Sequence, residues 1–267
     1  MLSGTDLEQF FREGYAGPFD LPQQFVRPYT QPGFLESVCD YFRTQSHGGA
    51  TAFCDRLRNQ HLYSNSLCTL VSEESLLSRV RSLLGPDLLL WLGHVAPRLP
   101  GETGQQWHVD ADNRYVRGIH VSIALSDNTV DNGCLQLIPG SHLFRASLDA
   151  AASAALIDRR DSRSILRYAS ETAPWKEHAI LPMSLRSGQY FVMSEGMWHF
   201  VGANITGACR LNVVARYART DVTCRNYGYS DSEIDTGELL SCILVSGRDR
   251  FGINRIVARP SDDIFHP

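Results

Sequence analysis

The chain has 267 residues, of which 43% are hydrophobic and 20% charged, as is ordinary for a soluble globular protein. Its formal net charge of −4 argues against nucleic acid or an anionic membrane surface as the main partner, because both favour a basic face. The first residues lack the basic start and apolar stretch of a signal peptide, and the longest strongly apolar run, 87–93, is too short to span a bilayer. We therefore expect a cytoplasmic protein without a membrane segment, whose oligomeric state stays open.

The first third of the chain is predicted to be helical. Thr5 and Glu8 form a capping-box pattern at the start of one helix. Residues 35–42 carry apolar side chains at the i, i+3, i+4, i+7 spacing of a buried helical stripe. Ser72 can cap a third helix, which the Gly-Pro pair at 85–86 ends.

After residue 86 the pattern changes to short strands separated by clusters of Gly, Pro, Asn and Asp. The predicted strands cover 88–96, 117–126, 134–138, 189–193 and 210–217. Short strands with turn signals of this kind indicate a sandwich or barrel, and a jelly roll is one natural closure. Between 143 and 185 the strand pattern lapses into a segment rich in Ala, Arg and Asp, which we expect to be an insertion of helix and loop.

These elements favour a single domain over residues 1–267, mainly β with flanking α-helices. We divide it into a mostly helical N-terminal part (1–86), a jelly-roll core (87–220) that contains the insertion 143–185, and a C-terminal extension (221–267). The extension either closes over the core or packs elsewhere.

The seven cysteines are widely spaced and include no CxxC pair. An odd count with this spacing favours reduced, mostly buried thiols over a disulfide framework or a zinc site.

A candidate metal site begins at Trp107-His108-Val109-Asp110. Alternation along a strand would put His108 and Asp110 on one face, so that an imidazole and a carboxylate can reach one metal ion. If His199 ends one strand and Arg210 begins its antiparallel neighbour, both also point into the barrel. Two histidines and one carboxylate form the facial triad of non-haem iron(II) oxygenases.

Such a triad leaves three adjacent positions on an octahedral ion. 2-Oxoglutarate can fill two through its 2-oxo and C1 carboxylate oxygens, and O2 takes the third. The distal carboxylate then needs an always-charged, bidentate partner, which an inward-facing Arg210 supplies.

In these motifs the sequence resembles the phytanoyl-CoA dioxygenase family. The resemblance rests on His108-Val-Asp110, the run 131–142, and His199 followed by Asn204 and Arg210, and it extends from about 91 to 217. It implies a double-stranded β-helix (jelly-roll, cupin-like) core and a dioxygenase that uses Fe(II), 2-oxoglutarate and O2. It makes His108, Asp110 and His199 the catalytic iron ligands and Arg210 the partner of the 2-oxoglutarate C5 carboxylate.

The resemblance also suggests further residues of the cosubstrate pocket. Ser122 falls where family members often line the 2-oxoglutarate pocket, and His120 shares its face. Family members commonly carry a serine two residues after the distal histidine, whereas this chain has Val201. Thr206, Asn204 or His120 are the candidates to compensate, and Asn204 can equally serve as a turn former.

The reaction and substrate are predicted more coarsely. Asp110 stands where halogenating relatives have a small residue, which favours hydroxylation, desaturation, epimerisation or oxidative ring closure of a C–H bond. The stretch after the metal motif is polar, and the candidates for the mouth of the site are Asp112, Asn113, Arg114, Tyr115 and Arg117. We expect a polar small-molecule substrate, such as a bacterial natural-product intermediate of antibiotic biosynthesis, including glycosylated ones.

Two other classes remain open. The chain could be a non-catalytic jelly-roll module that binds a metal or ligand, although such a module would not need Arg210. It could also be a zinc-dependent hydrolase, since the same ligands can hold zinc with an open position. Glu195 is then the only nearby candidate for the general base. His142, in a Pro-Gly-Ser-His turn, is interpreted as structural.

Overall fold

The computed structural model describes residues 1–31, 33–45, 59–110, 118–225 and 238–262. The helices are α1 (Gly4–Glu13), α2 (Gln23–Val26), η1 (Arg27–Tyr29), α3 (Phe34–Gln45), η3 (Gln60–Leu62), α5 (Asn65–Val71), α6 (Glu74–Leu84), η5 (Ser141–Leu143), α7 (Leu148–Ser153) and α8 (Ser162–Thr172). The strands are β1 (Tyr15–Asp20), β2 (Leu88–Arg98), β3 (Gln105–His108), β4 (Gly118–Ala124), β5 (Leu135–Leu137), β6 (Leu181–Pro182), β7 (Gln189–Ser194), β8 (His199–Val201), β9 (Arg210–Arg219), β10 (Ser241–Ser246) and β11 (Arg255–Ile256).

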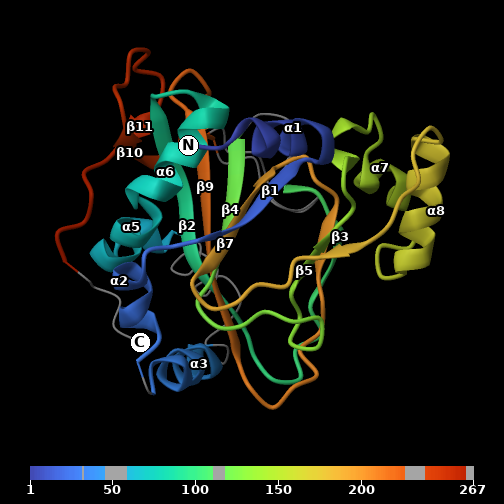
Figure 1. Cartoon of the computed structure of the whole chain (residues 1–267), viewed down its shortest axis with the longest axis horizontal. Helices are drawn as coiled ribbons and strands as arrows, with labels where there is room; N and C mark the ends of the chain where they lie inside the picture. Colours follow the sequence, from blue (N-terminus) through green and yellow to red (C-terminus); the bar gives the residue numbers. More distant parts are fainter. Residues whose placement is uncertain (32, 46–58, 111–117, 226–237, 263–267) are drawn as a thin grey trace.

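The strands form two sheets, in the orders β1-β7-β4-β9-β2-β10-β11 and β3-β8-β5-β6. The pairings are antiparallel except for β10 with β11. Figure 1 shows the smaller sheet standing across the interior from the larger one. A cavity lined from both sheets, by residues of β2, β4 and β9 and of β3 and β8, lies between them. This arrangement gives the mainly β core with flanking helices that the strand pattern predicts.

Alternation along the central strands explains how one sheet serves both the core and the cavity. On β4, the side chains of Ile119, Val121 and Ile123 join the main hydrophobic core, whereas His120 and Ser122 line the cavity. Strand β9 follows the same rule: its core residues alternate with residues that line the cavity, which are polar except for Val214. The apolar face packs against helices of the N-terminal part, α1, α3, α5 and α6, whose buried residues belong to the same core.

The segment 143–185 contains the predicted helix, as α7 and α8 beside the smaller sheet (Figure 1), but it also supplies β6, which pairs with β5 in that sheet. Its buried residues, such as Leu148 and Ile165, make a separate core with Trp107 and Trp198. Trp107 donates from Nε1 to Ser162 Oγ at 3.1 Å. The insertion therefore packs against the two tryptophans that immediately precede the candidate metal histidines.

Two predicted helix starts are wrong, and one predicted end is right. Ser3 caps α1 in a capping box with Asp6, so the helix begins before the predicted Thr5. Glu73 caps α6 through its side chain, because Ser72 already ends α5. Gly85 ends α6 as predicted, at a positive φ of 90° that suits glycine.

The expectation of reduced cysteines throughout is also wrong, because Cys39 and Cys209 form a disulfide across a sequence separation of 170. It links α3 to the turn that precedes β9, two segments whose proximity no local pattern reveals. Cys68, Cys134, Cys224 and Cys242 are buried and take no part in this disulfide, as expected, and Cys54 lies outside the described residues.

The C-terminal extension packs against the larger sheet in its described part. Strand β10 pairs with β2, with Ile243 opposite Leu90, and β11 pairs with β10. Within the ranges that the structure describes, none of the helices has the length and apolar character needed to cross a membrane.

Candidate metal centre

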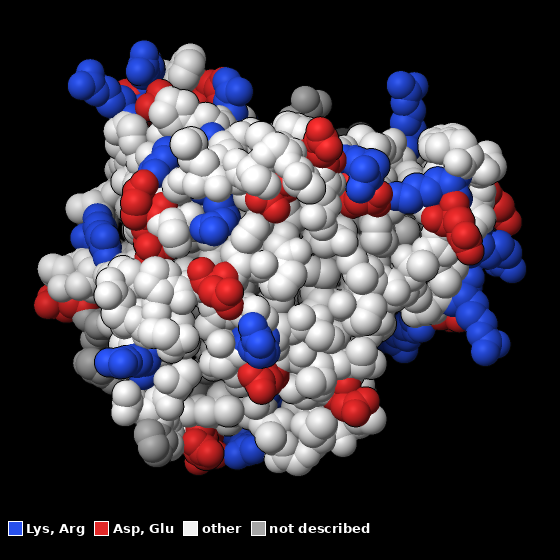
Figure 2. Space-filling view, viewed as in Figure 1, with Lys and Arg blue, Asp and Glu red and all other residues white. Residues whose placement is uncertain are grey.

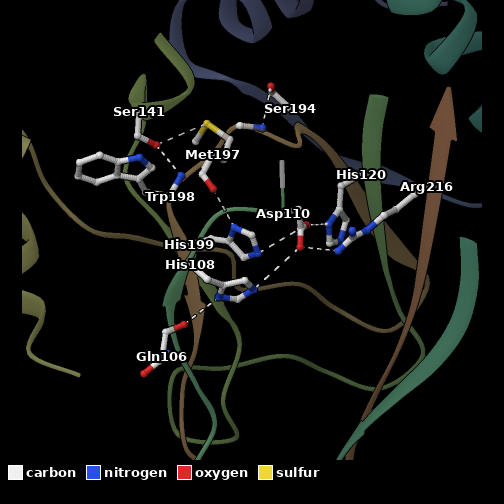
Figure 3. A network of polar contacts seen from close by, with 11 residues as sticks. Gln106, His108, Asp110, His120, Ser141, Ser194, Met197, Trp198, His199 and Arg216 are labelled. Atoms are coloured by element: carbon white, nitrogen blue, oxygen red, sulfur yellow. Dashed lines mark hydrogen bonds and ion pairs between the residues drawn. The ribbon is translucent and has the colours of Figure 1, made fainter. Parts of the chain in front are cut away.

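Three candidate ligands meet between the two sheets (Figure 3). His108 ends β3 and His199 begins β8, and the two are direct partners in the ladder, with ring centroids 4.2 Å apart. His199 Nε2 lies 3.7 Å from Asp110 Oδ2, and His108 Nε2 lies 4.0 Å from Asp110 Oδ1. One ligand atom from each residue falls within 4.8 Å of the other two. Bonds of about 2.0–2.2 Å to one central ion fit these separations.

The elements that carry these residues differ from the prediction in two respects. Strand β3 ends at His108, so Asp110 reaches the site from the turn beyond the strand and not from the same strand face. His199 and Arg210 do not lie on neighbouring strands, because β8 belongs to the smaller sheet and β9 to the larger. Both side chains line the cavity between the two sheets.

Backbone carbonyls orient both imidazoles. His108 Nδ1 is 2.8 Å from the carbonyl oxygen of Gln106, and His199 Nδ1 is 2.9 Å from that of Met197. A carbonyl can only accept, so each Nδ1 carries the proton and each Nε2 presents its lone pair toward Asp110. The Trp198 backbone N–H donates to Ser141 Oγ at 2.8 Å, which holds the segment before His199 in place.

The protonation states suit metal binding. Burial alone would raise the pKa of Asp110, but the charge of Arg216, followed by His199 and His120, holds the pKa well below its ordinary value. Burial, followed by the nearby His108, lowers the pKa of His199 to about 3. At neutral pH the site therefore offers an ionised carboxylate and a neutral imidazole, the forms that coordinate a metal.

A cavity of about 490 Å³ opens on the three ligands and includes Arg210 and Ser122 in its lining. Arg210 is only 3% exposed, and no carboxylate of the described residues lies within ion-pair distance of it. Burial, followed by the charge of Arg98, lowers its pKa to about 10. The Asn212 side chain lies 3.3 Å from Ser122 Oγ, and its amide oxygen can accept from Arg210 Nη1 at 2.9 Å. This end of the cavity can bind an anion.

Other predicted pocket residues have different partners. His120 Nδ1 lies 2.8 Å from Asp110 Oδ2, so the His120 ring is hydrogen-bonded to a candidate metal ligand. Asn204 donates to the backbone oxygens of Arg98 and Ala208, and it accepts from Thr206 within the turn. These hydrogen bonds agree with the interpretation of Asn204 as a turn former. The Thr206 hydroxyl takes part in the same turn.

The remaining residues weighed from the sequence also have defined positions. Val201 lines the cavity, whereas Glu195 is not among the described lining residues and is buried against Gly118. His142 Nε2 lies 3.2 Å from the Phe11 carbonyl oxygen, in agreement with a structural role for this turn. Residues 112–117 lie outside the described part of the chain.

Sequence reasoning missed Arg216, whose guanidinium bonds to Asp110 Oδ1. The signal was present, because Arg210, Asn212, Val214 and Arg216 alternate along one face of β9. A face that carries Arg210 into the cavity must carry Arg216 there as well.

The phytanoyl-CoA dioxygenase family matches residues 31–212, which is more than half of the chain. The chain belongs to this family. The protein named dioxygenase lolE1, from Epichloe uncinata, is 29% identical over 158 residues, which cover 58% of this chain and 56% of that relative. The chain thus spans about half, or less, of the length of the curated relatives it matches.

Solved structures support the same fold for this family member. A nickel complex of the non-heme monooxygenase ThoJ has a TM-score of 0.68 and 25% identity, covering 96% of this chain and 89% of that one. CytC3 with Fe(II) and alpha-ketoglutarate has a TM-score of 0.63 and 22% identity, covering 96% and 94%. The predicted family and its jelly-roll fold are confirmed, and the predicted dioxygenase class with its iron and 2-oxoglutarate is that of the family.

Proposed function

We propose that this chain is an iron(II)- and 2-oxoglutarate-dependent oxygenase that oxidises a C–H bond of a polar small molecule. The observation that carries the proposal is Arg210, a buried cation without a described carboxylate partner, in the same cavity as the three candidate ligands. A buried charge without a partner is costly, so its retention points to an anionic ligand that completes the site. Neither a zinc hydrolase nor a simple metal-binding module requires such a residue.

The donor set suits iron(II). His108 and His199 would bind the metal through Nε2 and Asp110 through a carboxylate oxygen, the facial arrangement that leaves three positions for other ligands. When bound, iron and 2-oxoglutarate supply O2-dependent oxidation of an unactivated C–H bond.

The protein's own residues would bind and orient 2-oxoglutarate, and they exclude water from the site. The Arg210 guanidinium would hold the distal carboxylate of 2-oxoglutarate, with Ser122 and Asn212 beside it. The buried rings of Trp107 and Trp198 close the outer side of the histidine-bearing strands to solvent.

The size and lining of the cavity support a small polar substrate. Its volume of about 490 Å³ also has to accommodate 2-oxoglutarate, and its polar lining includes His94, Glu102 and Gln105. In Figure 2, basic and acidic side chains alternate over the centre of the face shown, where neither sign forms a continuous patch. A natural-product intermediate, glycosylated or not, remains our proposal for the substrate.

The test is 2-oxoglutarate turnover by the full chain with iron(II) in air. We expect succinate and CO2 in equal amounts, first as slow uncoupled turnover and then faster with a compound from a panel of polar natural products. His199→Ala should abolish turnover, whereas His178→Ala should leave it unchanged, because the His178 side chain bonds to the Ala173 carbonyl outside the cavity. Absence of succinate and CO2 with iron, together with ester or amide hydrolysis with zinc, would support the hydrolase instead.

A further inference from the structure

Both oxygens of Asp110 are held from the opposite sheet. Its Oδ2 lies 2.8 Å from His120 Nδ1, and its Oδ1 accepts from Arg216 Nη2. Figure 3 shows His120 and Arg216 converging on the carboxylate from the side opposite the two metal-site histidines. The Asp110 side chain is 6% exposed, so water contributes little to its orientation.

The two holding residues form one unit of the larger sheet. His120 on β4 and Arg216 on β9 are direct partners in the antiparallel ladder, and both are buried, at 4% and 7% exposure. Side chains that are direct partners project from the same face of a sheet. The guanidinium of Arg216 also lies over the Trp91 ring, 5.4 Å from its centroid, which restricts its movement.

We propose that His120 and Arg216 are positioning residues that clamp Asp110 in one orientation for metal binding. This proposal rests on the assignment of Asp110 as a ligand, but it does not depend on 2-oxoglutarate. Asp110 arrives from a turn beyond β3, so the strand itself does not fix its side chain. The clamp supplies the orientation that the local backbone does not.

The clamp has a consequence for coordination. A carboxylate whose two oxygens are each bound by a donor offers a metal one oxygen and cannot rotate to chelate it with both. Asp110 would therefore bind a metal through a single oxygen and would leave one more coordination position for other ligands than a bidentate carboxylate would. Partners of this kind typically change metal affinity about 10–100-fold when they are removed.

The first test uses cobalt(II) alone, added to the metal-free full chain without 2-oxoglutarate and followed by its visible absorption. Arg216→Met should weaken cobalt binding about 10–100-fold and change the spectrum, and Arg216→Lys should restore part of the affinity. Arg219→Met is the matched control, because Arg219 lies on the same strand, pairs with Asp221 and is exposed. Unchanged affinity and spectrum in a folded Arg216→Met variant would overturn the proposal.

A rescue experiment keeps the test decisive if Arg216→Met does not fold. Asp110→Gly leaves the His120 and Arg216 donors facing an empty position, so added formate should restore cobalt affinity at least about tenfold. Formate should have little effect on the double variant Asp110→Gly/Arg216→Met. Absence of rescue in the single variant, or equal rescue in both, would refute the clamp.

The two proposals fail in different ways. If the parent chain binds cobalt but 2-oxoglutarate never perturbs the bound metal, the oxygenase assignment fails and the clamp stands. If 2-oxoglutarate binds but neither Arg216→Met nor formate affects cobalt affinity, only the clamp fails.

Discussion

Replacing Arg210 with methionine should stabilise the free protein and weaken 2-oxoglutarate binding, two effects of opposite sign. Burial, then the charge of Arg98, lowers the Arg210 pKa from its ordinary value to about 10. The folded state therefore disfavours the charged form at every pH below about 10, and this free-energy cost disappears only as the pH rises from there toward the ordinary pKa of an arginine. A difference of this size corresponds to about 3 kcal/mol at neutral pH.

The expected magnitudes follow from that cost. Methionine fills much of the same volume, so we expect Arg210→Met to raise the free energy of unfolding of the free protein by about 2 kcal/mol and Tm by about 4–8 °C. Removing one partner of a buried, hydrogen-bonded charge pair costs about 2–5 kcal/mol of binding, so 2-oxoglutarate affinity should fall about 30-fold or more. Saturating 2-oxoglutarate should then stabilise the parent above the variant.

Thermal unfolding with and without anaerobic iron(II) and 2-oxoglutarate measures both effects. Arg79→Met is a suitable contrast, because Arg79 donates to the Ser75 carbonyl and to Tyr190 Oη, away from the cavity. That variant should lose stability in both conditions without a change in 2-oxoglutarate affinity. The reasoning is refuted if Arg210→Met is less stable than the parent in the free state and binds 2-oxoglutarate equally well.

Three further predictions concern stability. Cys39→Ser should lower the free energy of unfolding by about 2–4 kcal/mol under oxidising conditions, measured by urea unfolding, because it opens the 170-residue link to Cys209. A difference of the same size between variant and parent under reducing conditions, where neither has the disulfide, would contradict this. Because the His199 pKa is lowered to about 3, metal-free protein should lose stability as the pH falls below 6.5, and His199→Gln should reduce the loss between pH 7 and pH 4.5 by about 2–3 kcal/mol. Ile165→Ala, at a fully buried side chain, should lower the free energy of unfolding by about 2–5 kcal/mol and weaken iron binding. Leu156→Ala, at a side chain that is 57% exposed, should change neither the free energy of unfolding nor iron binding.

The sequence predicts the site better than the path of the chain that builds it. Residue types and order select His108, Asp110 and His199 as candidate ligands, because iron(II) chemistry constrains the donor atoms, and the structure brings one ligand atom of each within 4.8 Å of the others. The same reasoning assumed that strand alternation carries Asp110, whereas β3 ends at His108 and the turn beyond it brings the carboxylate inward. Where a short strand ends depends on pairing with β8, which is a tertiary property.

Contacts between residues far apart in the sequence are the other feature that the sequence does not predict. Two-residue alternation on β9 could have placed Arg216 inside together with Arg210, since both belong to one face. Its partner Asp110 lies 106 residues away in sequence, and Cys39 lies 170 residues from Cys209. Pairings at such separations follow from the packing of the two sheets and α3, so periodicity within one segment does not reveal them.

The central claim is that one cavity binds iron(II) through His108, Asp110 and His199 and 2-oxoglutarate through Arg210. The most direct measurement is the visible metal-to-ligand charge-transfer band of anaerobic protein titrated with iron(II) and 2-oxoglutarate. We expect a band in the parent, no band in His199→Ala, and a band in Arg210→Ala only at far higher 2-oxoglutarate. Absence of the band in the parent at saturating iron(II) and 2-oxoglutarate would contradict the account.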